Sequence, residues 1–113
     1  MLNNELKYGV VLTTVSSKEL GNAIAESLLT AKLAACINIF PVTSFYTWQE
    51  KTNCDSEWQL IIKTDLNLLS ELTAKIQSLH DYEVPEIIAL PIIDGSESYL
   101  NWLGSSLKIS SKP

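Results

Sequence analysis

The chain has 113 residues, which suits a single domain over residues 1–113 with an expected ordered core at about residues 8–107. Its hydrophobic fraction of 46% is sufficient for a packed core, and no apolar run approaches the roughly 20 residues of a membrane span. All 8 basic residues are lysines and the net charge is −5, which argues against nucleic-acid binding and against arginine-based phosphate recognition. Because the first residues lack a signal-peptide pattern, we expect a cytoplasmic protein.

The beginning of the chain predicts a strand followed by a helix. Residues 8–15 form a β-branched run, which is typical of a strand. Ser16 and Glu19 match a capping box, in which each side chain satisfies a free backbone amide of the other. Apolar residues then recur at helical spacing, so we expect a helix that ends near Lys32.

The middle of the chain predicts two strands joined by a polar connection. Residues 34–40 are typical of a second strand, which Pro41 interrupts and which resumes over residues 42–48. Residues 49–56 are polar and are expected to connect the strands of a hairpin. Residues 57–64 alternate between two faces, which indicates a third strand.

The last part predicts a helix, a strand and a short final helix. Leucines and an isoleucine recur at helical spacing over residues 66–79. Residues 86–93 are nearly all apolar and predict a buried strand, in which Pro91 indicates an edge position or a bulge. Ser96 is expected to cap a short helix whose apolar face continues to Leu107.

The predicted order is therefore β-α-β-β-α-β with an extra C-terminal helix. This order is typical of the α+β class and of a ferredoxin-like sandwich, with two helices on one face of an antiparallel sheet. Phe45 and Tyr46 are sequence neighbours, so both faces of the predicted hairpin are aromatic. Such a hairpin is buried most easily against another subunit, and the alternative is a hairpin packed only on its own domain.

Five motifs resemble the CutA family and occur in the order found in that family, and the resemblance covers the chain from Val10 to Leu107. They are residues 32–38, 44–48, 59–64, 80–86 and 99–103. The resemblance implies a ferredoxin-like fold and a cytoplasmic homotrimer similar to the trimeric PII signalling proteins, with clefts between subunits. It also implies tolerance of copper and other divalent cations, with no enzymatic reaction securely attached to the family.

His80 and Glu86 are the candidate metal ligands. Imidazole nitrogen and carboxylate oxygen suit zinc or copper(II), although about four ligands are needed to complete a site. Some members of the family carry cysteine at the position of Thr13 and histidine at the position of Leu79, and this chain lacks both. Soft copper(I) binding is therefore disfavoured, and the alternative is a hydrogen-bonded pocket histidine.

A second hypothesis treats the same region as a small-molecule pocket between subunits. Trp48, Lys63 and Tyr82, with the histidine and glutamate above, combine aromatic surface with a few polar groups. Alternatively, the aromatic residues fill a trimer interface, and Lys63 is solvated or pairs with Glu57 or Asp55 across the hairpin.

The sequence thus favours a non-catalytic homotrimer that responds to divalent metal ions, with copper or zinc as the only cofactor indicated and neither nucleic acid nor membrane as partner. The first alternative is a PII-like sensor that binds an organic ligand in the cleft between subunits and signals to a protein partner. The second is an enzyme that uses His80 as a general acid or base. No nucleophile elbow or phosphate-binding glycine loop supports that enzyme.

Overall fold

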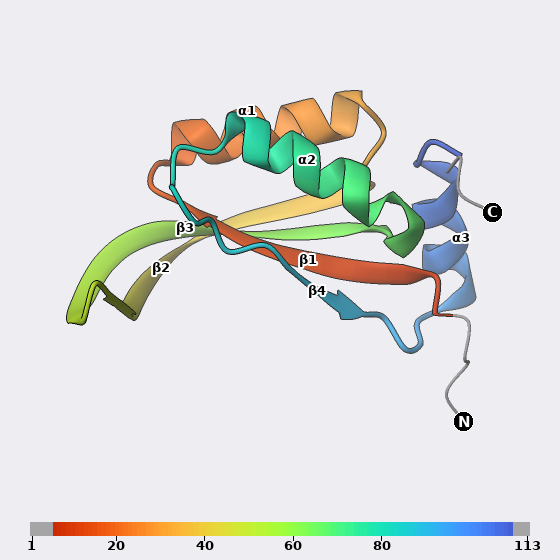
Figure 1. The fold of residues 1–113 in the computed structure, drawn as a ribbon. Coiled ribbons are helices and arrows are strands. Elements are labelled where there is room, and N and C mark those ends of the chain that lie inside the picture. The colour runs from red at the N-terminus through yellow and green to blue at the C-terminus, as the bar shows by residue number, and fades with distance from the viewer. Residues whose placement is uncertain (1–5, 110–113) are drawn as a thin grey trace.

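The computed structural model describes residues 6–109 and has an α+β fold (Figure 1). Its four strands form one antiparallel sheet in the order β2-β3-β1-β4. Helices α1 and α2 cover one face of the sheet, and α3 lies at one end of it (Figure 1). This arrangement confirms the predicted ferredoxin-like order with an extra C-terminal helix. The elements are β1 (Tyr8–Val15), α1 (Lys18–Thr30), β2 (Cys36–Trp48), β3 (Lys51–Asp65), η1 (Leu66–Leu68), α2 (Leu69–Leu79), β4 (Ile88–Pro91) and α3 (Glu97–Ser105).

The hydrophobic core lies between the sheet and the first two helices. Alternate residues of the central strands point toward the helices, because successive side chains of a strand face opposite sides. The fully buried side chains are Val11 and Val15 of β1, Leu60 and Ile62 of β3, Ile24 and Leu28 of α1, and Leu72 and Ile76 of α2. The opposite face of the sheet carries no helix in Figure 1.

Helix α1 begins one residue later than predicted. The hydroxyl of Ser17, rather than that of Ser16, accepts a hydrogen bond of 3.1 Å from the backbone N–H of Leu20. Ser16 instead donates to Oδ2 of Asp81 at 3.1 Å. This contact joins segments far apart in the sequence, so the spacing of Ser16 and Glu19 does not indicate it. The capping-box assignment was therefore wrong.

The hairpin of β2 and β3 is longer, and its turn tighter, than predicted. Strand β2 continues through Pro41, which is tolerated because β2 is an edge strand and, within residues 6–109, its outward N–H groups have no sheet partner. The turn consists only of Gln49 and Glu50, with φ of 51° and 65°, as a two-residue hairpin turn requires. The predicted interruption of β2 and the predicted connection over residues 49–56 were therefore wrong.

Beyond the end of β1, the hairpin projects from the sheet as an arm made of residues 42–48 and 51–57 (Figure 1). Because β1 ends opposite Trp58, residues 51–57 pair with β2 on one side only. Phe45 and Tyr46 lie on opposite faces of the arm, and the Phe45 side chain is 73% exposed. The polar sequence of residues 51–56 suits a strand here because the arm stands clear of the core.

Strand β4 is shorter and more exposed than predicted. It pairs only with β1 and forms an edge of the sheet, which confirms the position inferred from Pro91. Its residues Ile88 and Leu90, and the nearby Ile93, are each half exposed. The expectation of a buried strand is therefore wrong for a single chain, because nothing within residues 6–109 covers this face of the edge.

The C-terminal half of the chain contains two well-capped helical segments. The Asp65 carboxylate accepts a hydrogen bond of 2.8 Å from the N–H of Asn67 and caps η1, which leads into α2. Ser96 accepts from the N–H of Tyr99 at 3.3 Å, which confirms its predicted capping of α3. None of the helices within residues 6–109 is long and apolar enough to cross a membrane.

Candidate functional site

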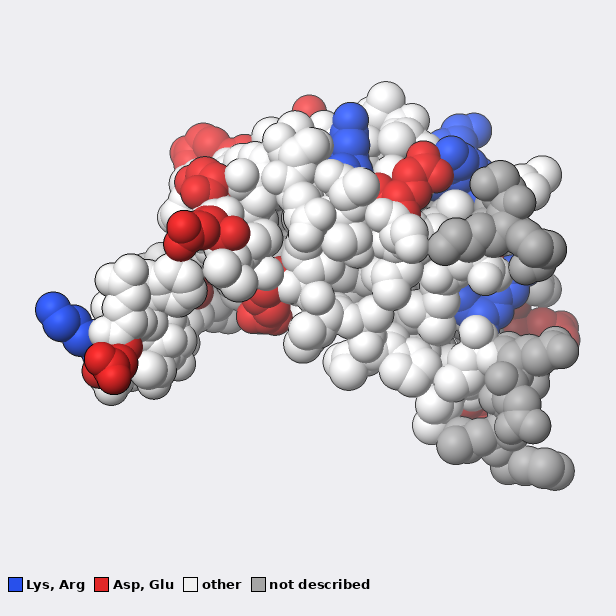
Figure 2. Space-filling model, viewed as in Figure 1, with Lys and Arg blue, Asp and Glu red and all other residues white. Residues whose placement is uncertain are grey.

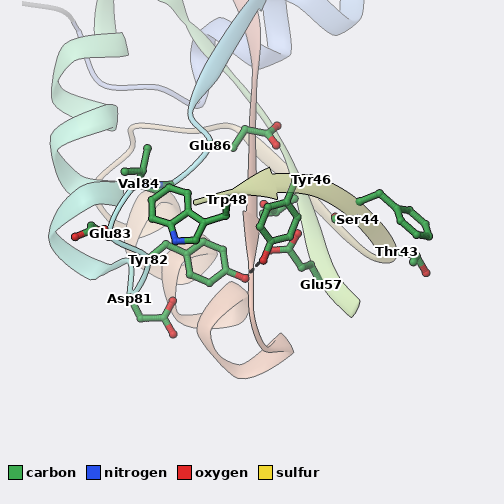
Figure 3. A pocket seen from close by; sticks show the side chains of 13 residues that line it. Thr43, Ser44, Tyr46, Trp48, Glu57, Asp81, Tyr82, Glu83, Val84 and Glu86 are labelled. Carbon is green, nitrogen blue, oxygen red and sulfur yellow. Dashed lines mark hydrogen bonds between the residues drawn. The ribbon is translucent and has the colours of Figure 1, made fainter. Parts of the chain in front are cut away.

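A cleft of about 870 Å³ lies between the hairpin arm and the segment that follows α2 (Figure 3). Strand β2 supplies Tyr46 and Trp48 to its walls, and the segment after α2 supplies Tyr82, Val84 and Glu86. The long β2–β3 ladder holds the arm in place. Trp48, Tyr82 and Glu86, which the sequence assigns to a pocket between subunits, line this cleft within a single chain.

Tyr82 and Glu57 are joined at the cleft wall. The Tyr82 hydroxyl donates a hydrogen bond of 2.5 Å to Oε2 of Glu57, whose side chain is only 7% exposed. Burial, together with this carboxylate, raises the pKa of Tyr82 well above its usual value, because ionising the phenol would place a second negative charge beside Glu57. Tyr82 is therefore a stable hydrogen-bond donor to Glu57 at neutral pH.

A second tyrosine–carboxylate pair lies next to the first on the arm. The Tyr46 hydroxyl donates to Oδ2 of Asp55, and this hydrogen bond raises the pKa of Tyr46. Figure 3 shows Tyr46 and Tyr82 both pointing toward the Glu57 carboxylate. Both rings thereby present aromatic surface to the same part of the cleft.

The charged residues of the cleft wall are all acidic. Glu57, Asp81, Glu83 and Glu86 contribute carboxylates, and no lysine of residues 6–109 lines the cleft. Figure 2 shows acidic side chains gathered on the left of the view, where α2 ends and the arm leaves the sheet. The electrostatic character of the cleft therefore favours cations over anions.

His80 lies behind the cleft wall and does not line it, since its side chain is only 1% exposed. The backbone N–H of Tyr82 donates to its Nδ1 at 3.1 Å, so Nδ1 acts as an acceptor. Its Nε2 must then carry the proton, and it donates to the backbone oxygen of Thr14 at 2.8 Å. The ring thus fastens the segment after α2 to the end of β1.

These contacts do not suit His80 as a metal ligand. A metal ion needs a free lone pair on an imidazole nitrogen, and both nitrogens are occupied. Glu86 is exposed at the cleft and has the right chemistry, but within residues 6–109 no three His, Cys, Asp or Glu side chains gather closely enough to hold a metal. Within a single chain, Glu86 is therefore free to act as a ligand at the cleft, whereas His80 is not.

Lys63 also lies outside the cleft. Its Nζ donates to Oδ1 of Asn38 at 2.9 Å and lies 3.9 Å from Sγ of Cys36. Pairing with Glu57 or Asp55 was the wrong alternative, because these carboxylates lie six or more residues away along the same strand. Within one chain Lys63 therefore belongs to the open face of the sheet rather than to the cleft.

Sequence reasoning did not assign Glu57 and Tyr46 to the site. Glu57 follows a polar run and was considered as an alternative partner for Lys63 across the hairpin. Its hydrogen-bond partner Tyr82 lies 25 residues away in the sequence. No local sequence pattern indicates this contact, because it joins segments that are far apart in the chain.

The family model described as CutA1 divalent ion tolerance protein matches residues 9–106 of the chain. The chain belongs to this family. Among CutA1 relatives, the chloroplastic CutA protein of Arabidopsis thaliana is 49% identical over 100 residues, which are 88% of this chain and 55% of that protein. The divalent-cation tolerance protein CutA of Thermus thermophilus is 46% identical over 95 residues, 83% of this chain and 92% of that protein.

Solved CutA1 structures share the fold. The CutA1 structure from Oryza sativa superposes with a TM-score of 0.88 at 46% identity and covers 91% of this chain and 95% of that one. The structure from Archaeoglobus fulgidus, described as a periplasmic divalent cation tolerance protein CutA, gives 0.88 at 35% identity and covers 89% of this chain and 99% of that one. The chain spans only 55% of the length of the chloroplastic Arabidopsis thaliana protein and 58% of the length of the chloroplastic CutA 1 protein of Oryza sativa.

Proposed function

We propose that this chain acts in tolerance of divalent cations as a non-catalytic cytoplasmic homotrimer. The observation that carries the proposal is the family match over residues 9–106, which includes every strand and helix except the first residue of β1. Relatives are named as tolerance proteins rather than as enzymes, and their names place them in different compartments. The cytoplasm is the compartment we assign to this chain.

The homotrimer is supported by apolar surface that the chain leaves open. Half-exposed apolar side chains lie on β4 and its extension, and the ring of Phe45 is exposed on the hairpin arm. They are Ile88, Leu90, Ile93 and Phe45, and open apolar side chains of this kind suit a contact with another chain. Two sheet edges, along β2 and β4, are also free to pair with a neighbouring chain.

Copper(II) or zinc(II) remains the metal we propose, and Glu86 rather than His80 is the residue whose surroundings suit a ligand. Its carboxylate is exposed and lies in an acidic cleft, whereas the His80 ring makes two hydrogen bonds. The remaining ligands would come from other carboxylates of the cleft or from adjoining subunits. A bound divalent ion would neutralise part of the negative charge there.

The proposal is tested by isothermal titration calorimetry of the metal-free protein with copper(II) and zinc(II). We expect Glu86→Gln to weaken binding, while His80→Gln and the control Glu97→Gln, on α3, leave it unchanged. Growth of a copper-sensitive bacterial strain lacking its own CutA1 gene should be restored by the chain. Absence of rescue would contradict a role in cation tolerance.

A second candidate function, a PII-like sensor that signals to a protein partner, is favoured by the cleft itself. Its volume and its mixture of aromatic walls with a few polar groups suit a small organic ligand. An enzyme that uses His80 as general acid or base has no such support, because the ring is buried and does not face the cleft.

A further inference from the structure

The most unusual charge in the cleft is the carboxylate of Glu57. It is more than nine-tenths buried, yet no lysine lies within ion-pair distance of it among residues 6–109. The hydrogen bond that its Oε2 accepts comes from the neutral hydroxyl of Tyr82. Burying a carboxylate without a counter-charge is costly, so this position favours a cation supplied from outside the chain.

The surroundings of Glu57 suit an organic cation better than a bare metal ion. The phenol rings of Tyr46 and Tyr82 and the indole of Trp48 line the same cleft and offer it π faces (Figure 3). An ammonium group is attracted to such faces by the negative potential above an aromatic ring. A metal ion would instead need several oxygen or nitrogen ligands at short distance.

The size and charge of the cleft agree with this choice. About 870 Å³ is far more than a single ion fills, and it lies in the range of pockets for small organic ligands. Val84 and Pro85 add apolar wall beside the rings, and Glu86 adds a second carboxylate at the exposed side. No lining residue offers a positive charge to an anionic ligand.

We propose that this cleft binds a small organic ammonium compound, with its charged nitrogen near Glu57 and its substituents against the rings of Trp48, Tyr46 and Tyr82. The inference rests on the sensor candidate above and gives it a ligand class. It assigns Trp48 the role of aromatic wall and Glu57 the role of counter-charge, and it predicts discrimination against uncharged molecules of the same shape.

The test is calorimetric titration of the assembled protein with choline and with 3,3-dimethyl-1-butanol (dimethylbutanol), in which an uncharged carbon replaces the nitrogen of choline. We expect choline to bind and dimethylbutanol to bind at least about fivefold more weakly. Trp48→Leu should weaken choline binding about threefold to tenfold. Trp102→Leu, which removes a similarly exposed indole on α3 outside the cleft, should leave it unchanged.

Glu57→Gln should weaken choline binding as well, provided that circular dichroism shows an intact fold. Glu86→Gln, at an exposed position, gives a charge test that does not depend on a buried residue. No choline binding up to about 10 mM, or equal binding of the uncharged analogue, would overturn the inference. Copper(II) titration of the same sample is a separate readout, so choline binding can fail while the cation-tolerance proposal stands, or the reverse.

Discussion

The hydroxyl of Tyr82 donates a 2.5 Å hydrogen bond to Oε2 of Glu57 and thereby ties the segment after α2 to the base of the hairpin arm. His80 secures the same segment to the end of β1 through the backbone oxygen of Thr14. The cleft wall is therefore held at two points by side chains that are only two residues apart in the sequence. Its shape depends on both contacts.

Removing the Tyr82 hydroxyl should destabilise the protein. Tyr82→Phe leaves the buried Glu57 carboxylate without a hydrogen-bond partner, so we expect a loss of about 1–3 kcal/mol in the free energy of unfolding, measured by urea denaturation. Tyr46→Phe is the matched control, because its acceptor Asp55 is exposed and can be hydrated instead. That control should change stability by less than about 0.5 kcal/mol, and equal losses in the two variants would contradict the special status of Glu57.

The raised pKa of Tyr82 predicts a loss of stability in alkali. The unfolded phenol loses its proton near pH 10, whereas the folded phenol retains it to higher pH. This contribution is therefore complete below about pH 10 and declines as the pH rises above it. We expect the urea midpoint of the wild type to fall between about pH 9.5 and pH 11.5 more steeply than that of Tyr82→Phe. Tyr99→Phe, outside the cleft, controls for the loss of a phenol, and parallel profiles for all three proteins would refute the prediction.

Two buried threonines of the sheet should respond in opposite ways to the same substitution. Thr13 and Thr64 are both fully buried, but the hydroxyl of Thr13 has no partner within residues 6–109, whereas that of Thr64 donates to the backbone oxygen of Leu33 at 2.6 Å. Thr13→Val should therefore stabilise the fold by about 1 kcal/mol, and Thr64→Val should destabilise it by about 1 kcal/mol. Thermal and urea unfolding measure both, and a loss of stability in Thr13→Val would show that its hydroxyl is satisfied.

The hairpin turn should be improved by residues that accept positive φ. Gln49 and Glu50 adopt φ of 51° and 65°, which costs energy for residues with a long side chain. The double substitution Gln49→Asn and Glu50→Gly matches the preferred sequence of a two-residue turn and should raise the free energy of unfolding by about 1 kcal/mol. Thr47→Asn, within β2, is the control and should give no gain. An unchanged unfolding midpoint in the double variant would mean that the turn is ordered independently of its residues.

The proposed homotrimer predicts that a charge on β4 separates the subunits. Leu90→Glu places a carboxylate on the half-exposed face of this edge strand, where an interface would have to bury it. Leu29→Glu makes the same change at a similarly exposed position on α1 and should leave the assembly intact. Light scattering coupled to size-exclusion chromatography measures the mass of each variant. A trimeric Leu90→Glu protein would exclude β4 from the interface.

The order of the elements could be predicted because alternation and helical spacing are local properties of the sequence. Pro91 even indicated the edge position of β4, since proline cannot donate a ladder hydrogen bond. The turn at Gln49 and Glu50 could not be predicted, because neither residue is typical of positive φ and the register of the whole ladder imposes that conformation. The interruption predicted at Pro41 was wrong for a related reason, because proline interrupts a strand only where its missing N–H is needed by a neighbouring strand, and β2 lies at an edge.

The candidate site was predicted only in part. Trp48, Tyr82 and Glu86 belong to recognisable motifs and do line one cleft. The engagement of both His80 nitrogens involves a backbone oxygen 66 residues away, which residue types and spacing do not reveal. For the same reason the burial of Glu57 was missed.

The projecting arm has a consequence for how the protein reaches its working form. Residues 51–57 present an unpaired strand edge next to aromatic side chains. Such an edge can pair with strands of other chains and thereby start aggregation. The charges of Lys51 and Asp55 on this arm, and of Glu50 in its turn, oppose such stacking. For the proposed homotrimer, assembly would compete with aggregation of newly folded chains, so the refolding yield should fall as the protein concentration rises.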